Sequence, residues 1–300
     1  MSSGDLPTVV SLCEDFNHGR IYEIFWEYCD LTPEILRERK ANCWLYYENG
    51  KLCGFGLGRR RHRGFLCMGG AFIFEEVWAP CEGLSSELGQ PSKRDIKRVI
   101  QFKRLIDSMN GSFLTVLRTA TYNQFAHMIA RELKASWING LIIAEKTLNR
   151  KFEFSYPNGY ESRLFENGDQ FYMSKIHEKA FKEKAAPKIY KAWATATNCR
   201  TILATHHNTP VGFIIAEKRR CGSLGDFSIA VDPAHHGRGI GSVLLRAAFN
   251  AFIDVKVKKV VADYLILNSS AHRLYQKHNF RTKRIYNYFL YSRDTKKEVI

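Results

Sequence analysis

The segment VDPAHHGRGIGSVLL, from Val231 to Leu245, places three alternating glycines between an apolar stretch and a helical pattern. Gly237, Gly239 and Gly241 predict a loop whose backbone adopts conformations that side chains would hinder. The first turn of a helix has unpaired N–H groups and a partial positive charge, so a glycine loop that opens a helix suits a pyrophosphate. The segment therefore predicts a strand, a phosphate-binding loop and a helix.

Two common phosphate loops do not fit this segment. The sequence lacks GxxxxGK followed by Ser or Thr, which excludes the nucleoside-triphosphate loop. A dinucleotide fingerprint needs GxGxxG and an acidic residue at the end of the next strand. The spacing here is GxGxG, and Asp263 lies inside the next predicted strand.

The second half of the chain alternates predicted strands and helices. Strands are expected at 162–166, 225–231, 259–266 and 284–293, and a hairpin at 201–220 with its turn at 208–210. Helices are expected at 169–185, with Asp169 as the N-cap, and from Pro187 to 196, at 242–253 and at 269–280.

The first half repeats this order of elements. Strands or hairpins are expected at 7–13, 43–58, 65–80, 112–120 and 140–148, and helices at 20–29, 32–40, 93–109 and 123–137. Three short segments of the first half match three of the second half in the same order. GKLCGF matches NTPVGF, VWAP matches AVDP, and NQFAH matches NSSAH. We interpret this as an internal duplication of an α/β unit, with domains at 1–150 and 151–300.

Composition narrows the class of protein and its partners. The net charge of +15 divides into +3 for residues 1–150 and +12 for residues 151–300, which favours a polyanionic ligand for the second half. No stretch of apolar residues is long enough for a transmembrane helix, and we expect no signal peptide. The eight cysteines lack metal-binding spacing, so we expect reduced thiols, a cytoplasmic protein and no metal.

Two segments of the second half resemble motifs of the GNAT acetyltransferase superfamily. They are SIAVDPAHHGRGIGSVLL and, later in the chain, NSSAHRLYQKHNF. That family carries Q/R-x-x-G-x-G/A after a V-x-P strand end, and later N-x-x-A-x-x-L-Y-x-x-x-G-F. The matching residues are Val231, Pro233, Gly239, Gly241, Asn268, Ala271, Leu274, Tyr275 and Phe280. His236 stands where the family has Gln or Arg, and Asn279 replaces the Gly before Phe280. Asn tolerates the left-handed turn that this Gly would adopt.

The resemblance covers about residues 155–295 and implies two GNAT-like mixed-sheet domains in tandem. It implies transfer of an acetyl group from acetyl-CoA, or of another acyl group from its CoA ester, to a primary amine by direct attack. The residues that it assigns to the cofactor are Ile229, Ala230, Val231, His236, Gly237, Arg238, Gly239, Ile240, Gly241, Ser242 and Asn268. It assigns Tyr275 as the acid that protonates the leaving thiolate, and a phenol is protonated at neutral pH as this role requires.

The family often places a base on the strand before the glycine loop, where this chain has Asp226 and Ser228. Alternation puts both on one face of the strand. Asp226 is the candidate base, and a solvated strand-end Asp is the alternative interpretation. The lesser candidates His206, His207, His235 and His272 are equally explained as surface residues.

The first half lacks the glycine loop, and Ala130 aligns with Tyr275, so it resembles a degenerate GNAT unit without acyl-CoA. The basic run GRRRHRG at 58–64 is interpreted as a solvated hairpin tip, with an RNA or acidic partner as the alternative. The acceptor amine belongs to a small molecule or a protein. Two other functions remain open: an aminoacyl-tRNA-dependent transferase of similar tandem fold, and a non-catalytic protein that binds acyl-CoA or RNA.

Overall fold

The computed structural model describes two compact units, and the residues that it describes are 42–48, 51–62, 73–78, 100, 114–120, 124–219 and 222–292. The described residues from 142 to 283 form the unit that we call unit 2, and the other described residues belong to unit 1. The divisions fall inside strand β5 (Ser136–Thr147) and inside strand β11 (Arg281–Ser292). The described residues from 284 to 292 are therefore grouped with unit 1, and the division into domains at 1–150 and 151–300 stays a prediction.

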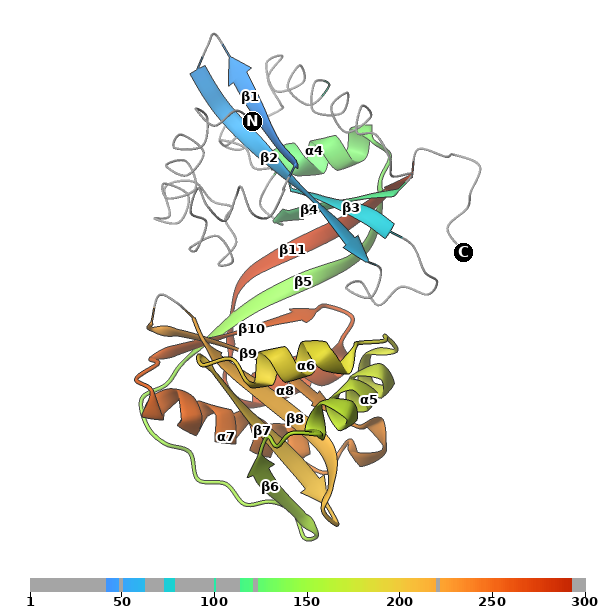
Figure 1. Ribbon diagram of the computed structural model, residues 1–300. Helices are drawn as coiled ribbons and strands as arrows, with labels where there is room; N and C mark the ends of the chain where they lie inside the picture. Colours follow the sequence, from blue (N-terminus) through green and yellow to red (C-terminus); the bar gives the residue numbers. More distant parts are fainter. Residues whose placement is uncertain are drawn as a thin grey trace. The chain divides into compact units, whose positions relative to one another are not determined.

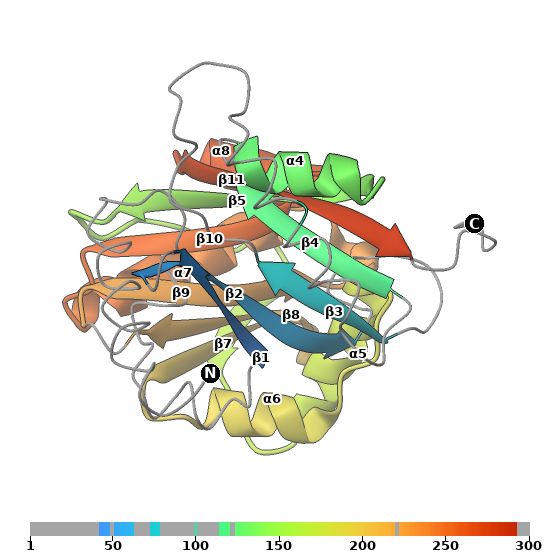
Figure 2. The same cartoon turned by 90° about the horizontal axis from the view of Figure 1, so that it is seen from above.

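Unit 2 contains a mixed seven-strand sheet with helices (Figure 1). Its elements are the end of β5, β6 (Tyr160–Leu164), α5 (Asp169–Phe181), α6 (Pro187–Ala194), β7 (Cys199–His206), β8 (Thr209–Lys218), β9 (Leu224–Val231), the short 3-10 helix η3 (Pro233–His235), α7 (Ile240–Asp254), β10 (Lys259–Leu265), α8 (Ser269–Lys277) and the start of β11. The strands follow the order β11-β5-β10-β9-β8-β7-β6, and Figure 2 shows β10, β9, β8 and β7 succeeding one another across the sheet. The β9–β10 pair is parallel, whereas the pairs β6–β7, β7–β8 and β8–β9 are antiparallel.

The alternation of side chains along β9 separates two apolar layers. Ala230 packs with Met173, Ile176 and Tyr190 of α5 and α6 and with Phe213 of β8. Helix α7 packs against β7, β8 and β9 and buries an apolar face that includes Leu244, Leu245, Phe249 and Phe252. Asp226 and Ser228 share the α5–α6 face with Ala230, whereas Phe227 lies on the opposite face.

The predicted elements of unit 2 occur where expected, with local corrections. The hairpin turn is His207–Asn208, both with positive φ, so Thr209 already begins β8. The N-cap of α5 is Gly168 rather than Asp169, whose carboxylate accepts hydrogen bonds from Arg163 and from the Glu166 N–H. Helix α5 ends at Phe181, where Lys182 is left-handed, and α8 ends at Lys277.

Unit 1 contains β1 (Asn42–Glu48), β2 (Lys51–His62), β3 (Ile73–Trp78), β4 (Leu114–Ala120), α4 (Gln124–Glu132) and parts of β5 and β11. Strands β1, β2 and β3 pair antiparallel, β3 pairs parallel with β4, and β4 pairs antiparallel with β11. The helices expected at 20–29 and 32–40, and all of 93–109 except Ile100, lie outside the described residues.

The basic run at 58–64 is not a hairpin tip as far as it is described. Gly58 to His62 belong to β2 and pair with β3, with Arg59 opposite Glu76 and Arg60 opposite Glu75. The run is therefore explained in part by its place in a paired strand.

Candidate active site

Strands β9 and β10 of unit 2 separate soon after they begin. They pair only at Lys259↔Leu224 and Val260↔Gly225, whereas β9 stays paired with β8 as far as Val231. From Asp226 to Val231 the edge of β9 that faces β10 therefore lacks a strand partner. Alternate backbone groups along this edge are available to an extended ligand.

Beyond the split, the chain turns through η3 into a loop that begins α7. Asp232 caps η3 by accepting a hydrogen bond from the Ala234 N–H and pairs with Lys179 at 2.6 Å. Gly237 and Gly239 have φ values of +74° and +84°, and a Cβ added to either would meet nothing within 4 Å. The loop thus uses the left-handed conformation that favours glycine, and it leaves open space in front of its backbone.

The backbone N–H groups of this loop provide the chemistry of an anion site. Within the described part of the chain, no N–H from Gly237 to Ser242 donates a hydrogen bond to another residue; the first N–H of this region that does so is that of Val243, to the Gly239 oxygen. These donors surround the N-terminus of the fifteen-residue helix α7, where the helix dipole also favours negative charge. The loop therefore offers backbone donors to an anion, which is the chemistry that a pyrophosphate requires.

Tyr275 of α8 lies near the split on the α7 side. Its ring packs against Phe227, Tyr264 and Phe280, with centroid distances of 5.8, 5.0 and 5.3 Å. Burial raises the pKa of the Tyr275 phenol above its ordinary value, and the charges of Asp263 and Asp226 raise it further. Its hydroxyl has no hydrogen-bond partner among the described residues. The phenol is therefore held protonated at neutral pH.

Asp226 lies one residue beyond the last β9–β10 pair, at the vertex of the split. Its Oδ1 accepts a hydrogen bond from the Phe227 N–H at 2.7 Å, its Oδ2 accepts one from Arg219, and its side chain is 14% exposed. Burial and the charge of Asp263 raise the pKa of Asp226 to about 7, and Arg219 opposes this rise. A carboxylate with this pKa can accept a proton at neutral pH.

Comparison with known proteins finds a family that matches the part of the chain containing β9, the α7 loop and Tyr275. Residues 166–280, from the turn before α5 to Phe280, match the family described as Acetyltransferase (GNAT) family. The match identifies residues 166–280 as a GNAT acetyltransferase domain. No relative was found among the curated proteins.

Solved structures resemble the chain well beyond the GNAT domain. A GCN5-related N-acetyltransferase from Sphaerobacter thermophilus is 15% identical, with 97% of this chain and 94% of the other covered at a TM-score of 0.69. A GNAT-family acetyltransferase from Colwellia psychrerythraea is 10% identical, with 96% and 97% covered at 0.61. A tandem GNAT protein from the clavulanic acid biosynthesis pathway is 13% identical, with 84% and 82% covered at 0.57. At these identities the likeness concerns the fold.

The other residues assigned to the cofactor divide into three groups. Ile229, Ala230 and Val231 lie on the stretch of β9 that does not pair with β10, and Gly237 to Ser242 form the loop and the first residues of α7. The His236 ring turns back, with Nε2 2.9 Å from the Val231 oxygen, and Asn268 caps α8 by accepting the Ala271 N–H. The side chains of His236 and Asn268 thus have structural contacts of their own, and their contact with a cofactor stays a prediction.

The candidate histidines have aromatic or tyrosine partners. His206 stacks on Tyr160 at 4.5 Å and lies near His207 and His235, and the Tyr160 hydroxyl bonds His235 Nδ1 at 2.8 Å. His272 Nδ1 lies 3.2 Å from the Tyr264 hydroxyl. The described residues contain no set of metal-ligating side chains and no helix able to cross a membrane.

Sequence reasoning missed three charged residues around Asp226: Arg219, Glu217 and Asp263. Arg219 donates a hydrogen bond to Asp226, and Glu217 is the direct partner of Asp226 in the β8–β9 ladder. The charge of Asp263 raises the pKa of both Asp226 and Tyr275. A signal was present for Glu217, because the predicted hairpin and next strand place it near Asp226. Arg219 stands among adjacent basic residues, and no sequence pattern distinguishes it from them.

Gly225 is the last residue of β9 that pairs with β10, and Gly225→Ala is expected to destabilise the GNAT domain by about 1–3 kcal/mol. A Cβ at this position would lie 2.7 Å from Cε1 of the Phe252 ring, which is fully packed in the core. Urea unfolding measures the change. Gly241→Ala is the control, since its Cβ would meet Leu274 at an ordinary 3.6 Å. Equal stability of the two variants would show that close packing at Gly225 is unimportant.

Proposed function

We propose that the GNAT domain transfers an acetyl group from acetyl-CoA to a primary amine by direct attack at the β9–β10 split. One observation carries this proposal. The backbone N–H groups of the α7 loop donate no hydrogen bond within the described residues, and they lie beyond the stretch of β9 that does not pair with β10. The loop would bind the pyrophosphate, and β9 from Ile229 to Val231 would pair with the pantetheine arm. Tyr275 at the inner end of the split supports acyl transfer over simple binding.

The two titratable groups would act from opposite sides of the split. Asp226 shares the α5–α6 face of β9, whereas the Tyr275 ring packs on the other face against Phe227. An amine arriving from the first side would give its proton to Asp226 and attack the thioester carbonyl carbon. The C–S bond would break, the thiolate would take the Tyr275 proton, and the second proton that the attacking nitrogen loses would restore the phenol.

A base matters because the acceptor is protonated in water. A lysine-like amine at pH 7 lies about 3.4 units below its pKa, which costs about 4.6 kcal/mol for the reactive neutral form. A carboxylate whose pKa is about 7 is half ionised at that pH and can accept this proton. The amine itself is not identified, and small amines and protein amino groups both fit the proposal.

Asp226→Asn is expected to remove one step from the pH dependence of kcat/KM. In the wild type the rate should rise as pH increases through about 7, because only the ionised carboxylate accepts a proton. In the variant this step should vanish, with a rate roughly 100-fold lower above neutral pH. Release of the CoA thiol, measured with a panel of small primary amines and peptides with free amino termini, gives both profiles. A step near pH 7 that persists in Asp226→Asn would exclude Asp226 as the base.

Unit 1 is proposed to be a degenerate GNAT-like domain that binds no acyl-CoA. Its parallel strands β3 and β4 pair from Glu75↔Thr115 to Trp78↔Arg118. Trp78 aligns with Val231 in the sequence. The pairing of β3 with β4 therefore continues through the positions at which β9 no longer pairs with β10. A closed pair leaves no edge for the pantetheine arm. We keep the tandem arrangement, a cytoplasmic location and an anionic partner for the basic surface as parts of this proposal.

A further inference from the structure

Arg219 follows β8 and joins two carboxylates that face each other across the sheet. Its Nη2 donates to Asp226 Oδ2, and its Nη1 lies 3.8 Å from Glu217 Oε1. Glu217 and Asp226 are direct partners in the β8–β9 ladder. Like charges in facing positions repel, so a cation between them is needed if both are to be ionised.

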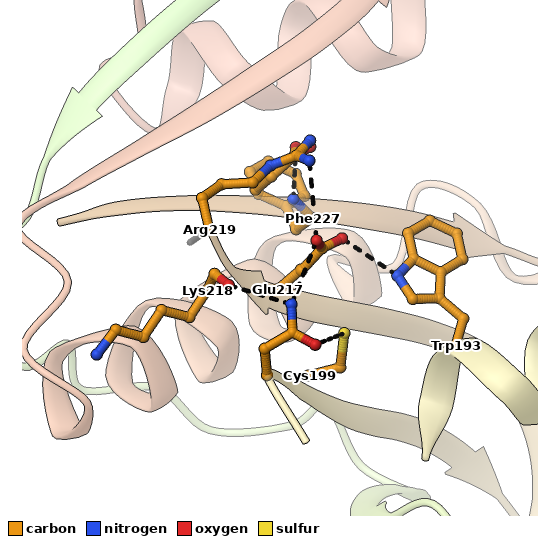
Figure 3. A network of polar contacts seen from close by, with 8 residues as sticks. Trp193, Cys199, Glu217, Lys218, Arg219 and Phe227 are labelled. Carbon is orange, nitrogen blue, oxygen red and sulfur yellow. Dashed lines mark hydrogen bonds and ion pairs between the residues drawn. The ribbon is translucent and has the colours of Figure 1, made fainter. Parts of the chain in front are cut away.

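Further side chains hold Glu217 from the side of α6 (Figure 3). Trp193 of α6 donates its indole N–H to Glu217 Oε2 at 3.3 Å. Asn198, just before β7, donates to Glu217 Oε1 at 3.4 Å and to the Lys218 oxygen at 3.2 Å. The contacts form a chain from Trp193 through Glu217 and Arg219 to Asp226.

This chain is mostly shielded from water. The side chains of Arg219, Glu217 and Asp226 are 24%, 21% and 14% exposed. An arginine fits here better than a lysine, because its planar group can contact two carboxylates with separate nitrogens. With the Phe227 N–H on Oδ1 and Arg219 on Oδ2, both oxygens of Asp226 have fixed donors.

We propose that Arg219 is a positioning residue that holds the Asp226 carboxylate at the vertex of the split, and that Glu217 and Trp193 hold Arg219. The role of Asp226 as the base rests on the proposed function. The contact between Arg219 and Asp226 does not depend on it.

The groups that act on Asp226 come from several elements. Glu217 faces it from β8, and Arg219 approaches from the β8–β9 connection. Asp263 of β10 raises its pKa, and the neutral phenol of Tyr275 lies on the far side. Among these groups only Arg219 carries a positive charge, so its removal should favour protonation of Asp226.

The test is a titration of Asp226 by carbon NMR in the full chain labelled at the aspartate carboxyl, with Asp226→Asn identifying the signal. Arg219→Met is expected to raise the Asp226 pKa by about one unit or more, since the attraction of an adjacent cation is lost. Arg219→Lys should keep most of the charge effect and shift the pKa by less than about half a unit. Lys218→Met is the matched control; its Nζ donates to the Val255 oxygen, and its loss should leave the titration unchanged.

Two results would overturn the proposal. One is an Asp226 titration in Arg219→Met that matches the wild type, and the other is an equal shift in Lys218→Met. Binding of acetyl-CoA, measured by calorimetry, shows that each variant is folded and should change less than about twofold. If Asp226 is not the base, Asp226→Asn keeps the wild-type pH profile while the NMR result for Arg219 still stands, so the two failures are distinct.

Discussion

Gly239→Asp is expected to lower the affinity for acetyl-CoA by at least about 100-fold, to below detection by calorimetry. Gly239 is the N-cap of α7 at φ +84°, a conformation that an aspartate adopts only with strain. Its carboxylate would also accept N–H groups from Gly241 or Ser242, as N-cap aspartates do. The new negative charge would then occupy the position proposed for the pyrophosphate.

The control for this variant is Gly168→Asp. Gly168 is the left-handed N-cap of α5, with φ +113° and nothing within 4 Å of an added Cβ. The substitution thus brings similar strain and the same charge to a different helix. Acetyl-CoA affinity should stay within about twofold of the wild type. Unchanged affinity in Gly239→Asp, or an equal loss in both variants, would contradict the assignment of the cofactor to the α7 loop.

Tyr275→Phe is expected to reduce kcat roughly 100-fold, with the acetyl-CoA dissociation constant unchanged within about twofold. The substitution removes one oxygen and keeps the ring that packs against Phe227, Tyr264 and Phe280. The hydroxyl has no hydrogen-bond partner among the described residues, so no protein contact is lost. What is lost is the proton donor for the thiolate, whose departure should then limit the rate.

Tyr264→Phe serves as the matched variant. Its ring lies 5.0 Å from that of Tyr275, but its hydroxyl bonds His272. Its kcat should fall by less than about threefold. The measurement is release of the CoA thiol with the best acceptor of the amine panel. A loss of less than threefold in Tyr275→Phe would falsify its role as general acid.

The sequence predicts the glycine loop and the left-handed Asn279 well, because both depend on backbone conformations that few residue types allow. Asn279 has φ +58°, as expected from its place before Phe280. The α7 helix is predicted for a different reason, because its apolar residues recur with helical spacing and become its buried positions.

The positions that sequence reasoning missed depend on tertiary contacts. Asp169 is predicted as a cap from its position, but Arg163 of β6 draws its carboxylate into an ion pair. The split itself is not visible in the sequence, because β9 and β10 each have an ordinary strand pattern. It depends on where the β9–β10 pairing stops, and Gly225 with Phe252 beneath it marks that point. The role of Arg219 likewise requires knowing that Glu217 and Asp226 face each other.

Acetyl-CoA is proposed to bind once per chain, along β9 and the α7 loop. Hydrogen exchange of backbone amides, measured by mass spectrometry with and without acetyl-CoA, tests it directly. Peptides that contain Ile229–Val231 and Gly237–Ser242 should exchange more slowly with the ligand, because their N–H groups would gain acceptors, while peptides from β3 and β4 should not change. Protection confined to other segments, or equal protection of β3, would contradict the account.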